Sequence, residues 1–247
     1  MWVPKWLGEY YSKLYVKFRS DLFTFNDARR LLSIDENRLS VAFSKLHSKR
    51  FILVFNRSRP RLYRLLDPEN IVFLASGIVK NFNEIHQERY LKLVLDCLRA
   101  SLKIFDLDSF AIYGSVARGV ASNMSDIDIL LVSDSFSGSI ASRMADMCKI
   151  EDLVTEELRW LRKNGIYTTL SLYPLRRKEA ERMPILFLDL TEDAVIFYDK
   201  DGFLENLLLD FKSKLTKAGA KRIFVNGKRW YWDLNPDYRR GETVGII

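Results

Sequence analysis

The chain has 247 residues, 48% of them hydrophobic and 29% charged, a composition that excludes disordered and fibrous proteins and is sufficient for substantial folded cores. No apolar run approaches the roughly 20 residues of a membrane span, and the N-terminus lacks a charged start followed by an apolar secretory segment, so we expect a cytoplasmic protein without membrane contact. The formal net charge of +7 is concentrated at one end, because residues 1–80 carry 15 Lys and Arg against 7 Asp and Glu, and the remainder carries 24 against 25.

The first 50 residues have the pattern of a helix-turn-helix. The spacing of their apolar residues predicts three helices, at 10–19, 27–32 and 36–46. Asn26 is the expected N-cap of the second helix, since a side-chain oxygen at that position can accept a hydrogen bond from a backbone N–H of the first turn. The third helix carries Leu39, Phe43 and Leu46 along one face.

Two apolar runs follow, 51–55 and 62–66, and they predict a β-hairpin whose tip, Asn-Arg-Ser-Arg-Pro-Arg, is basic. A helix-turn-helix with such a hairpin resembles a winged helix, which we expect over residues 1–80. Winged helices bind nucleic acid with the second helix of the helix-turn-helix in the major groove and the wing along the backbone. The candidate nucleic-acid-binding residues are Arg38, Lys45, Lys49, Arg50, Arg57, Arg59 and Arg61. The alternative is a protein-interaction domain whose basic residues form a solvated face.

A connecting helix over 84–104 leads to the most informative stretch, residues 110–132, where a Gly-Ser turn stands between two strand-like runs. Gly114 lets the backbone approach a phosphate closely, and Ser115 adds a hydroxyl and an amide. Asp126 and Asp128 project from one face of the second strand, roughly 6.6 Å apart at about 3.3 Å per residue. Two such carboxylates can bind a divalent cation, so the stretch predicts a site for a metal-bound triphosphate.

The ordered motifs Gly-Ser-Val-Ala-Arg-Gly (114–119) and Ser-Asp-Ile-Asp (125–128) resemble the DNA polymerase beta-like nucleotidyltransferase superfamily, in particular its minimal nucleotidyltransferase branch. With the winged helix, the whole chain resembles archaeal nucleotidyltransferase-domain proteins. The resemblance implies transfer of a nucleoside monophosphate from an NTP to an acceptor, with Mg²⁺ as the cofactor and Mn²⁺ as the alternative. The implied roles are Gly114 and Ser115 on the NTP phosphates, Arg118 orienting the loop or touching phosphate, and Asp126 and Asp128 in metal binding and catalysis.

The family also implies a third carboxylate on a later strand, which acts as general base and metal ligand. The next expected strand, 166–174, presents Thr169, Ser171 and Tyr173 on one face and no acid. Asp189 is the nearest downstream candidate for a catalytic carboxylate, although residues 186–193 can also be read as a helix end and a turn before the strand 194–198. A chain without this acid could bind nucleotide and metal and still lose most of its rate, because a placed base contributes about 10²–10⁴.

Helical spacing predicts two further helices, 139–163 and 203–217, and the tail over 221–242 interleaves basic and aromatic residues. Such a tail can stack on a base and hold phosphates, or its aromatics can pack on the domain. We therefore expect an α+β chain, with a nucleotidyltransferase domain over 81–247 built on a small mixed sheet with helices against one face.

The sequence favours a Mg²⁺-dependent nucleotidyltransferase with an NTP substrate and with nucleic acid or a protein as acceptor. Two alternatives remain open: a DNA-binding regulator that senses nucleotide through a catalytically silent domain, and an antitoxin-type nucleotidyltransferase that modifies a partner protein.

Overall fold

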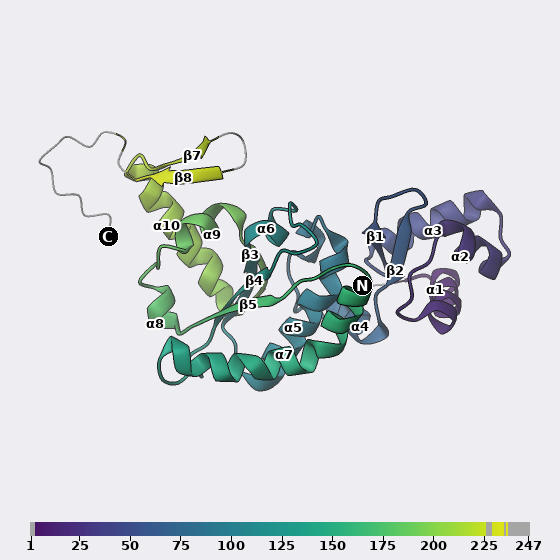
Figure 1. Ribbon diagram of the computed structural model, residues 1–247, viewed down its shortest axis with the longest axis horizontal. Coiled ribbons are helices and arrows are strands. Elements are labelled where there is room, and N and C mark those ends of the chain that lie inside the picture. The colour runs from purple at the N-terminus through teal and green to yellow at the C-terminus, as the bar shows by residue number, and fades with distance from the viewer. Residues whose placement is uncertain (1–2, 226–228, 235, 237–247) are drawn as a thin grey trace, which may run out of the picture.

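The computed structural model describes residues 3–225, 229–234 and 236. Figure 1 shows an elongated molecule with the purple N-terminal helices at one end, a sheet with its helices in the middle and a two-stranded hairpin near the other end. The N-terminal module (residues 3–66) has its own hydrophobic cluster. Its elements are α1 (Lys5–Phe18), α2 (Phe25–Leu32), α3 (Glu36–Ser48), β1 (Ile52–Asn56) and β2 (Leu62–Leu65).

Local hydrogen bonds fix where α2 and α3 begin. Thr24, and not Asn26, caps α2: its hydroxyl accepts from Asp27 N–H, and the Asp27 carboxylate accepts in turn from the Thr24 backbone. This reciprocal pair satisfies two backbone donors at once, which explains why the helix begins two residues earlier than expected. Asp35 caps α3 by accepting from Arg38 N–H at 2.9 Å.

β1 and β2 form the predicted antiparallel hairpin, and Phe23 adds a short bridge to Tyr63 beside it. One face of β1 points away from the module's own cluster, and its residues Leu53 and Phe55 join the large hydrophobic cluster of the main core. α4 (Pro68–Ala75) follows and also packs on that cluster through Leu74. The N-terminal module and the rest of the chain therefore share apolar contacts.

The central sheet has the strand order β5-β4-β3-β6. It consists of β3 (Ser109–Tyr113), β4 (Ile127–Val132), β5 (Leu170–Leu175) and β6 (Val195–Asp199). β3 runs antiparallel to β4 and β6, whereas β4 and β5 are parallel. The sheet is therefore small and mixed, as the sequence predicts.

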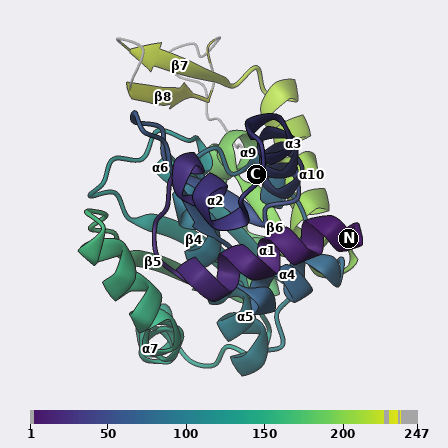
Figure 2. The ribbon, with the colours of Figure 1, turned by 90° about the vertical axis from the view of Figure 1, so that its right-hand side faces the viewer.

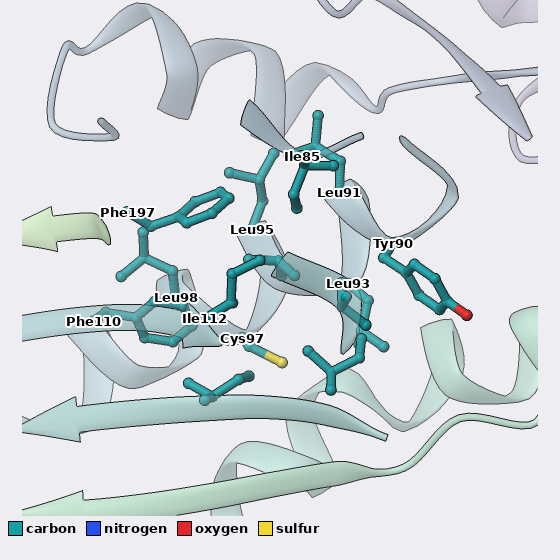
Figure 3. Packing of buried hydrophobic residues seen from close by; sticks show 14 of the residues in the cluster. Ile85, Tyr90, Leu91, Leu93, Leu95, Cys97, Leu98, Phe110, Ile112 and Phe197 are labelled. Carbon is teal, nitrogen blue, oxygen red and sulfur yellow. The ribbon is translucent and has the colours of Figure 1, made fainter. Parts of the chain in front are cut away.

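Helices cover both faces of this sheet, and the expectation of helices against one face was wrong. Ile127, Ile129 and Leu131 of β4 point into the cluster with α5 (Leu91–Ile104) and α7 (Ile140–Lys163). Figure 3 shows α5 side chains of this cluster against Phe110 and Ile112 of the sheet. Leu130 and Val132 point the other way, into a cluster with α8 (Arg177–Ala180), α9 (Phe187–Asp193) and α10 (Phe203–Lys217). Strict alternation along β4 produces this division.

The first helix begins at Lys5 and not at residue 10 as expected, and two further predicted boundaries differ from the structure. The helix expected over 84–104 begins at Leu91, after two 3₁₀ turns, η1 (Phe82–Glu84) and η2 (Glu88–Tyr90). The strand expected from residue 166 begins at Leu170, because Tyr167 and Thr168 bond to the loop before β4, through Asn123 O and Ser125 O. Both differences result from contacts with distant residues.

The C-terminal hairpin consists of β7 (Lys221–Val225) and β8 (Arg229–Asp233), paired antiparallel. Figures 1 and 2 show it beyond the end of α10, apart from the central sheet. Of the predicted basic and aromatic tail, residues 226–228, 235 and 237–242 lie outside the described residues. Across the part of the chain that the structure describes, no helix has the length and apolarity that a membrane span requires.

Candidate active site

Gly114 and Asp128 are in direct contact where β3 leads into the short helix α6 (Gly114–Ala117). Gly114 has a φ of +71°, and a Cβ added to it would lie 2.2 Å from Asp128 Oδ2. Any other residue type would strain the backbone and displace the carboxylate. The Gly-Ser turn and the carboxylate of Asp128 therefore lie against one another, as the motif predicts, and Ser115 follows half-buried in α6.

Strand pairing places polar side chains around the two aspartates. Asp128 pairs with Tyr113 on β3 and with Ser171 on β5, so the three side chains stand in a row on the sheet face that α9 and α10 cover. Asp126 precedes β4 and accepts a hydrogen bond of 2.6 Å from the Thr169 hydroxyl. Both aspartates thus have a hydroxyl partner from the segment at the start of β5.

The two carboxylates are electrostatically coupled. Burial raises the pKa of Asp128, and the charge of Asp126 raises it further, whereas a hydrogen bond from Ser171 and the charge of Arg118 act in the opposite direction. The net result is a pKa above the ordinary value for an aspartate. Two repelling carboxylates at one place favour a bound cation, which would offset their repulsion.

The structure gives this site two carboxylates and two hydroxyls. Ser171 occupies the β5 position beside Asp128, where a further acid would complete a three-carboxylate site, and β5 contains no Asp or Glu. Among the described residues, no group of three or more His, Cys, Asp or Glu side chains is arranged to hold a metal ion. The donor set nevertheless fits Mg²⁺, which is commonly bound through one or two carboxylates together with substrate phosphates and water.

Arg118 points toward α9 and the C-terminal hairpin. Its guanidinium donates to Asp193 Oδ2 at 2.9 Å and lies 4.5 Å from the centre of the Trp230 ring. Arg222 of β7 donates to both oxygens of Asp193 and also stacks on Trp230, at 4.1 Å. Burial would raise the pKa of Asp193, but the hydrogen bonds from Arg222 and Arg118 lower it below its ordinary value. Asp193 thus joins the end of α6 to the C-terminal hairpin.

Asp189 makes a different set of contacts from the other site candidates. It lies in the first turn of α9, and its Oδ1 accepts from the indole N–H groups of Trp230 and Trp232, at 2.9 and 3.1 Å. The hydrogen bonds of Asp189 thus anchor the C-terminal hairpin. By contrast, the hydroxyl partners of Asp126 and Asp128 are Thr169, just before β5, and Ser171 of β5. Sequence reasoning missed the roles of Asp193 and Arg222; the interleaved basic and aromatic residues of the tail were the available signal.

Six of the seven candidate nucleic-acid-binding residues form two groups. Arg38 and Lys45 are exposed on α3, and Lys49 is half-buried at its end. Three further arginines, which we call the wing arginines, are exposed at the β1–β2 tip: Arg57, Arg59 and Arg61. Arg50 does not join this surface, because it is only 9% exposed and bonds to Glu88 and Asn83.

Comparison with known proteins gives three similarities. The family model of the nucleotidyltransferase domain matches residues 91–222. A protein of Methanocaldococcus jannaschii described as a "putative protein adenylyltransferase" is 29% identical over 127 residues, which cover 51% of this chain and 80% of that protein. A crystal structure of a toxin-antitoxin with AMP-PNP aligns with a TM-score of 0.32 and 14% identity, over 57% of this chain and 94% of that chain. Because the family match spans more than half of the chain and includes the Gly-Ser turn and both aspartates, the chain belongs to the nucleotidyltransferase domain family.

Proposed function

We propose that this nucleotidyltransferase carries out Mg²⁺-dependent transfer of a nucleoside monophosphate, with ATP as the first donor to test and a protein or nucleic-acid hydroxyl as acceptor. The observation that carries the proposal is the contact of Gly114 with Asp128, beside the second carboxylate of Asp126. It brings a turn suited to phosphate next to a donor set suited to Mg²⁺. The resemblance to a protein adenylyltransferase supports ATP as donor and a protein as acceptor.

In this reaction the acceptor oxygen attacks the α-phosphorus, the bond to the bridging oxygen breaks, and pyrophosphate leaves with the electron pair of that bond. A bound Mg²⁺ supplies charge stabilisation at the phosphoryl oxygens. Asp126 and Asp128 would hold the cation, and Gly114 and Ser115 would contact the phosphates through the backbone. Thr169 and Ser171 orient the two carboxylates.

The acceptor proton has no assigned base in this proposal. Asp189 is held by two indoles and is better suited to anchoring the C-terminal hairpin. Proton loss to solvent would leave turnover slower by about 10²–10⁴ than with a placed base. Because Ser171, and not an acid, stands beside Asp128 on β5, a second candidate function is also supported: a regulator that binds nucleotide without turning it over. In the antitoxin-type alternative, the acceptor is a protein, namely the partner toxin.

We also propose that residues 1–80 form a winged-helix domain, residues 81–247 the nucleotidyltransferase domain, and that the winged helix contacts nucleic acid. The three helices, the hairpin and the exposed wing arginines support this assignment. The exposed face of α3, with Arg38, Val41 and Lys45, would enter the major groove, and the wing arginines would contact phosphates.

The test is label transfer from α-³²P-ATP, with Mg²⁺ or Mn²⁺, to a pool of cellular protein, RNA and DNA. The site variant is Asp126→Asn/Asp128→Asn, which preserves side-chain shape. Its matched control is Asp152→Asn/Asp210→Asn, which removes the same charge from two exposed helical positions.

Label transferred by the wild type and the control, but not by the site variant, supports the enzyme and identifies its acceptor class. Metal-dependent ATP binding without transfer supports the regulator. If neither binding nor transfer differs between the site variant and its control, the proposed site is wrong.

A further inference from the structure

A short segment, Gln87–Tyr90, connects the N-terminal module to the loop between α6 and β4. Glu88 faces the module and is only 7% exposed. Its carboxylate lies 2.7 Å from His47 Nε2 and 2.5 Å from Arg50 Nη1, and it accepts from Val54 N–H at 2.7 Å. Burial would raise the pKa of Glu88, but these partners lower it below its ordinary value. The Glu88 carboxylate is therefore ionised, and it binds residues of α3 and β1 and the turn between them.

The residues next to Glu88 face the opposite way, toward the active-site loop (residues 119–125). The Gln87 amide forms two hydrogen bonds with the Ala121 backbone, donating to its carbonyl at 2.8 Å and accepting from its N–H at 2.9 Å. The hydroxyl of Tyr90 donates to Ser122 O at 2.9 Å, and Arg89 donates to Asn123 Oδ1 and Ala121 O. Figure 3 shows Tyr90 at the edge of the core cluster with its hydroxyl directed away from it.

The active-site loop leads directly into the two aspartates. It begins after the Gly-Ser turn and Arg118, and it ends at Asp126. Its internal hydrogen bonds are confined to residues 122–125: Ser122 N–H donates to Ser125 Oγ, Met124 N–H to Ser122 Oγ and Ser125 N–H to Ser122 O, and the two serine hydroxyls bond to one another. Gln87 satisfies both the N–H and the C=O of Ala121, so the position of the loop depends on residues outside it.

We propose that Gln87 and Glu88 are positioning residues of the nucleotide site: the N-terminal module, through Glu88, fixes the Gln87–Tyr90 segment, and Gln87 fixes the active-site loop that leads into Asp126. This inference rests on the proposed function for its catalytic consequence, but its structural step stands apart from that function. Neither side chain touches the phosphate or the metal position. The two side chains act through the active-site loop. The nucleotide site lies in another part of the chain, but its geometry therefore depends on the N-terminal module.

A second contact between the same two parts provides the control. Arg64 of β2 forms a bidentate ion pair with Glu157 of α7, and the side chains are 4% and 5% exposed. This pair joins the N-terminal module to the core as Glu88 does, and no hydrogen bond of either side chain reaches the active-site loop. Loss of Glu157 weakens the junction and leaves the loop contacts in place.

The experiment compares Glu88→Gln, Gln87→Ala and the control Glu157→Gln in the full-length chain. Hydrogen exchange of peptides covering residues 119–127 reports the loop, and a fluorescent ATP analogue with Mg²⁺ reports the site. Denaturant unfolding of each variant ensures that the measurements are made on folded protein. Should Glu88→Gln fail to fold, Gln87→Ala still tests the step from the segment to the loop.

We expect faster exchange of the active-site loop and about 10–100-fold weaker nucleotide binding in Glu88→Gln and Gln87→Ala, the range typical of residues that orient metal ligands. Where turnover is measurable, kcat should fall together with affinity. Glu157→Gln should change neither. Unchanged loop exchange in the first two variants, or equal effects in Glu157→Gln, would overturn the proposal. If the wild type binds no nucleotide, the proposed function fails, and loop exchange alone decides the positioning role.

Discussion

Gly114→Ala tests how closely the phosphate turn and the aspartate site depend on one another. Alanine at φ +71° costs about 1–2 kcal/mol of backbone strain. Its Cβ would lie 2.2 Å from Asp128 Oδ2, so the carboxylate must move and lose its hydrogen bond from Ser171, worth about 1.5–3 kcal/mol. We expect a total loss of about 2.5–5 kcal/mol of unfolding free energy and at least tenfold weaker Mg²⁺-dependent nucleotide binding.

Gly77→Ala is the matched control, because Gly77 has a φ of +78° and no atom within 4 Å of an added Cβ. It carries the same backbone strain without the collision, so it should lose only about 1–2 kcal/mol and bind nucleotide normally. Denaturant unfolding and titration with a fluorescent ATP analogue measure the two effects. Equal stability losses in the two variants, with unchanged nucleotide affinity in Gly114→Ala, would refute the close contact with Asp128 as the basis of the site.

Four further predictions concern individual side chains. Asp193→Asn removes the charge between two guanidiniums and should loosen Arg118 and the C-terminal hairpin, seen as a changed tryptophan emission and weaker ATP binding; unaltered emission would contradict the link. Asp189→Asn keeps the oxygen that accepts both indole N–H groups, so transfer should persist, and a loss of about 10²-fold or more would instead identify a general base. Replacing the three wing arginines by glutamine should flatten the salt dependence of nucleic-acid binding by roughly 0.9 for each phosphate that the wing no longer neutralises, and an unchanged slope would remove the wing from the interface. Hydrogen bonds from Arg143 lower the pKa of Glu179 from 4.5 to about 2, so the ion pair stabilises the fold fully above about pH 4.5, and this stabilisation is lost as the pH falls through about 2. Glu179→Gln should therefore lower the unfolding free energy by about 2 kcal/mol at pH 7 and by little at pH 2. Urea unfolding measures this cost, and a cost that does not change with pH would contradict the ion pair.

The part of the candidate site that can be predicted from the sequence is local in the chain. Asp126 follows Ser115 by only eleven positions, and the alternation expected of a strand predicts that Asp126 and Asp128 face one way, although β4 itself begins at Ile127. The absence of an acid on β5 also follows from the sequence, because residues 166–174 contain no Asp or Glu. Strand pairing then brings the hydroxyls to the carboxylates.

The part that the sequence did not predict depends on residues far apart in the chain. Nothing near Asp193 indicates that its carboxylate binds Arg118, 75 residues earlier, and Arg222, 29 residues later. Helical spacing places Glu88 within a continuous helix over 84–104, because local spacing does not reveal its contacts with His47 and Val54. The helix begins later than its pattern predicts because tertiary hydrogen bonds outweigh a weak local preference.

The choice between an enzyme and a nucleotide sensor without turnover depends on how Ser171 affects the ionisation of Asp128. A hydroxyl there lowers the pKa of a carboxylate that burial and Asp126 raise, so it favours the ionised form that a metal requires. A third carboxylate in its place would bind metal more tightly but would add a further negative charge to two that already repel. Under the proposed function, this arrangement would preserve metal and nucleotide binding, and it would leave removal of the acceptor proton to a group supplied by solvent or by the acceptor itself. Slow transfer to an acceptor that brings its own base is the activity most consistent with these residues.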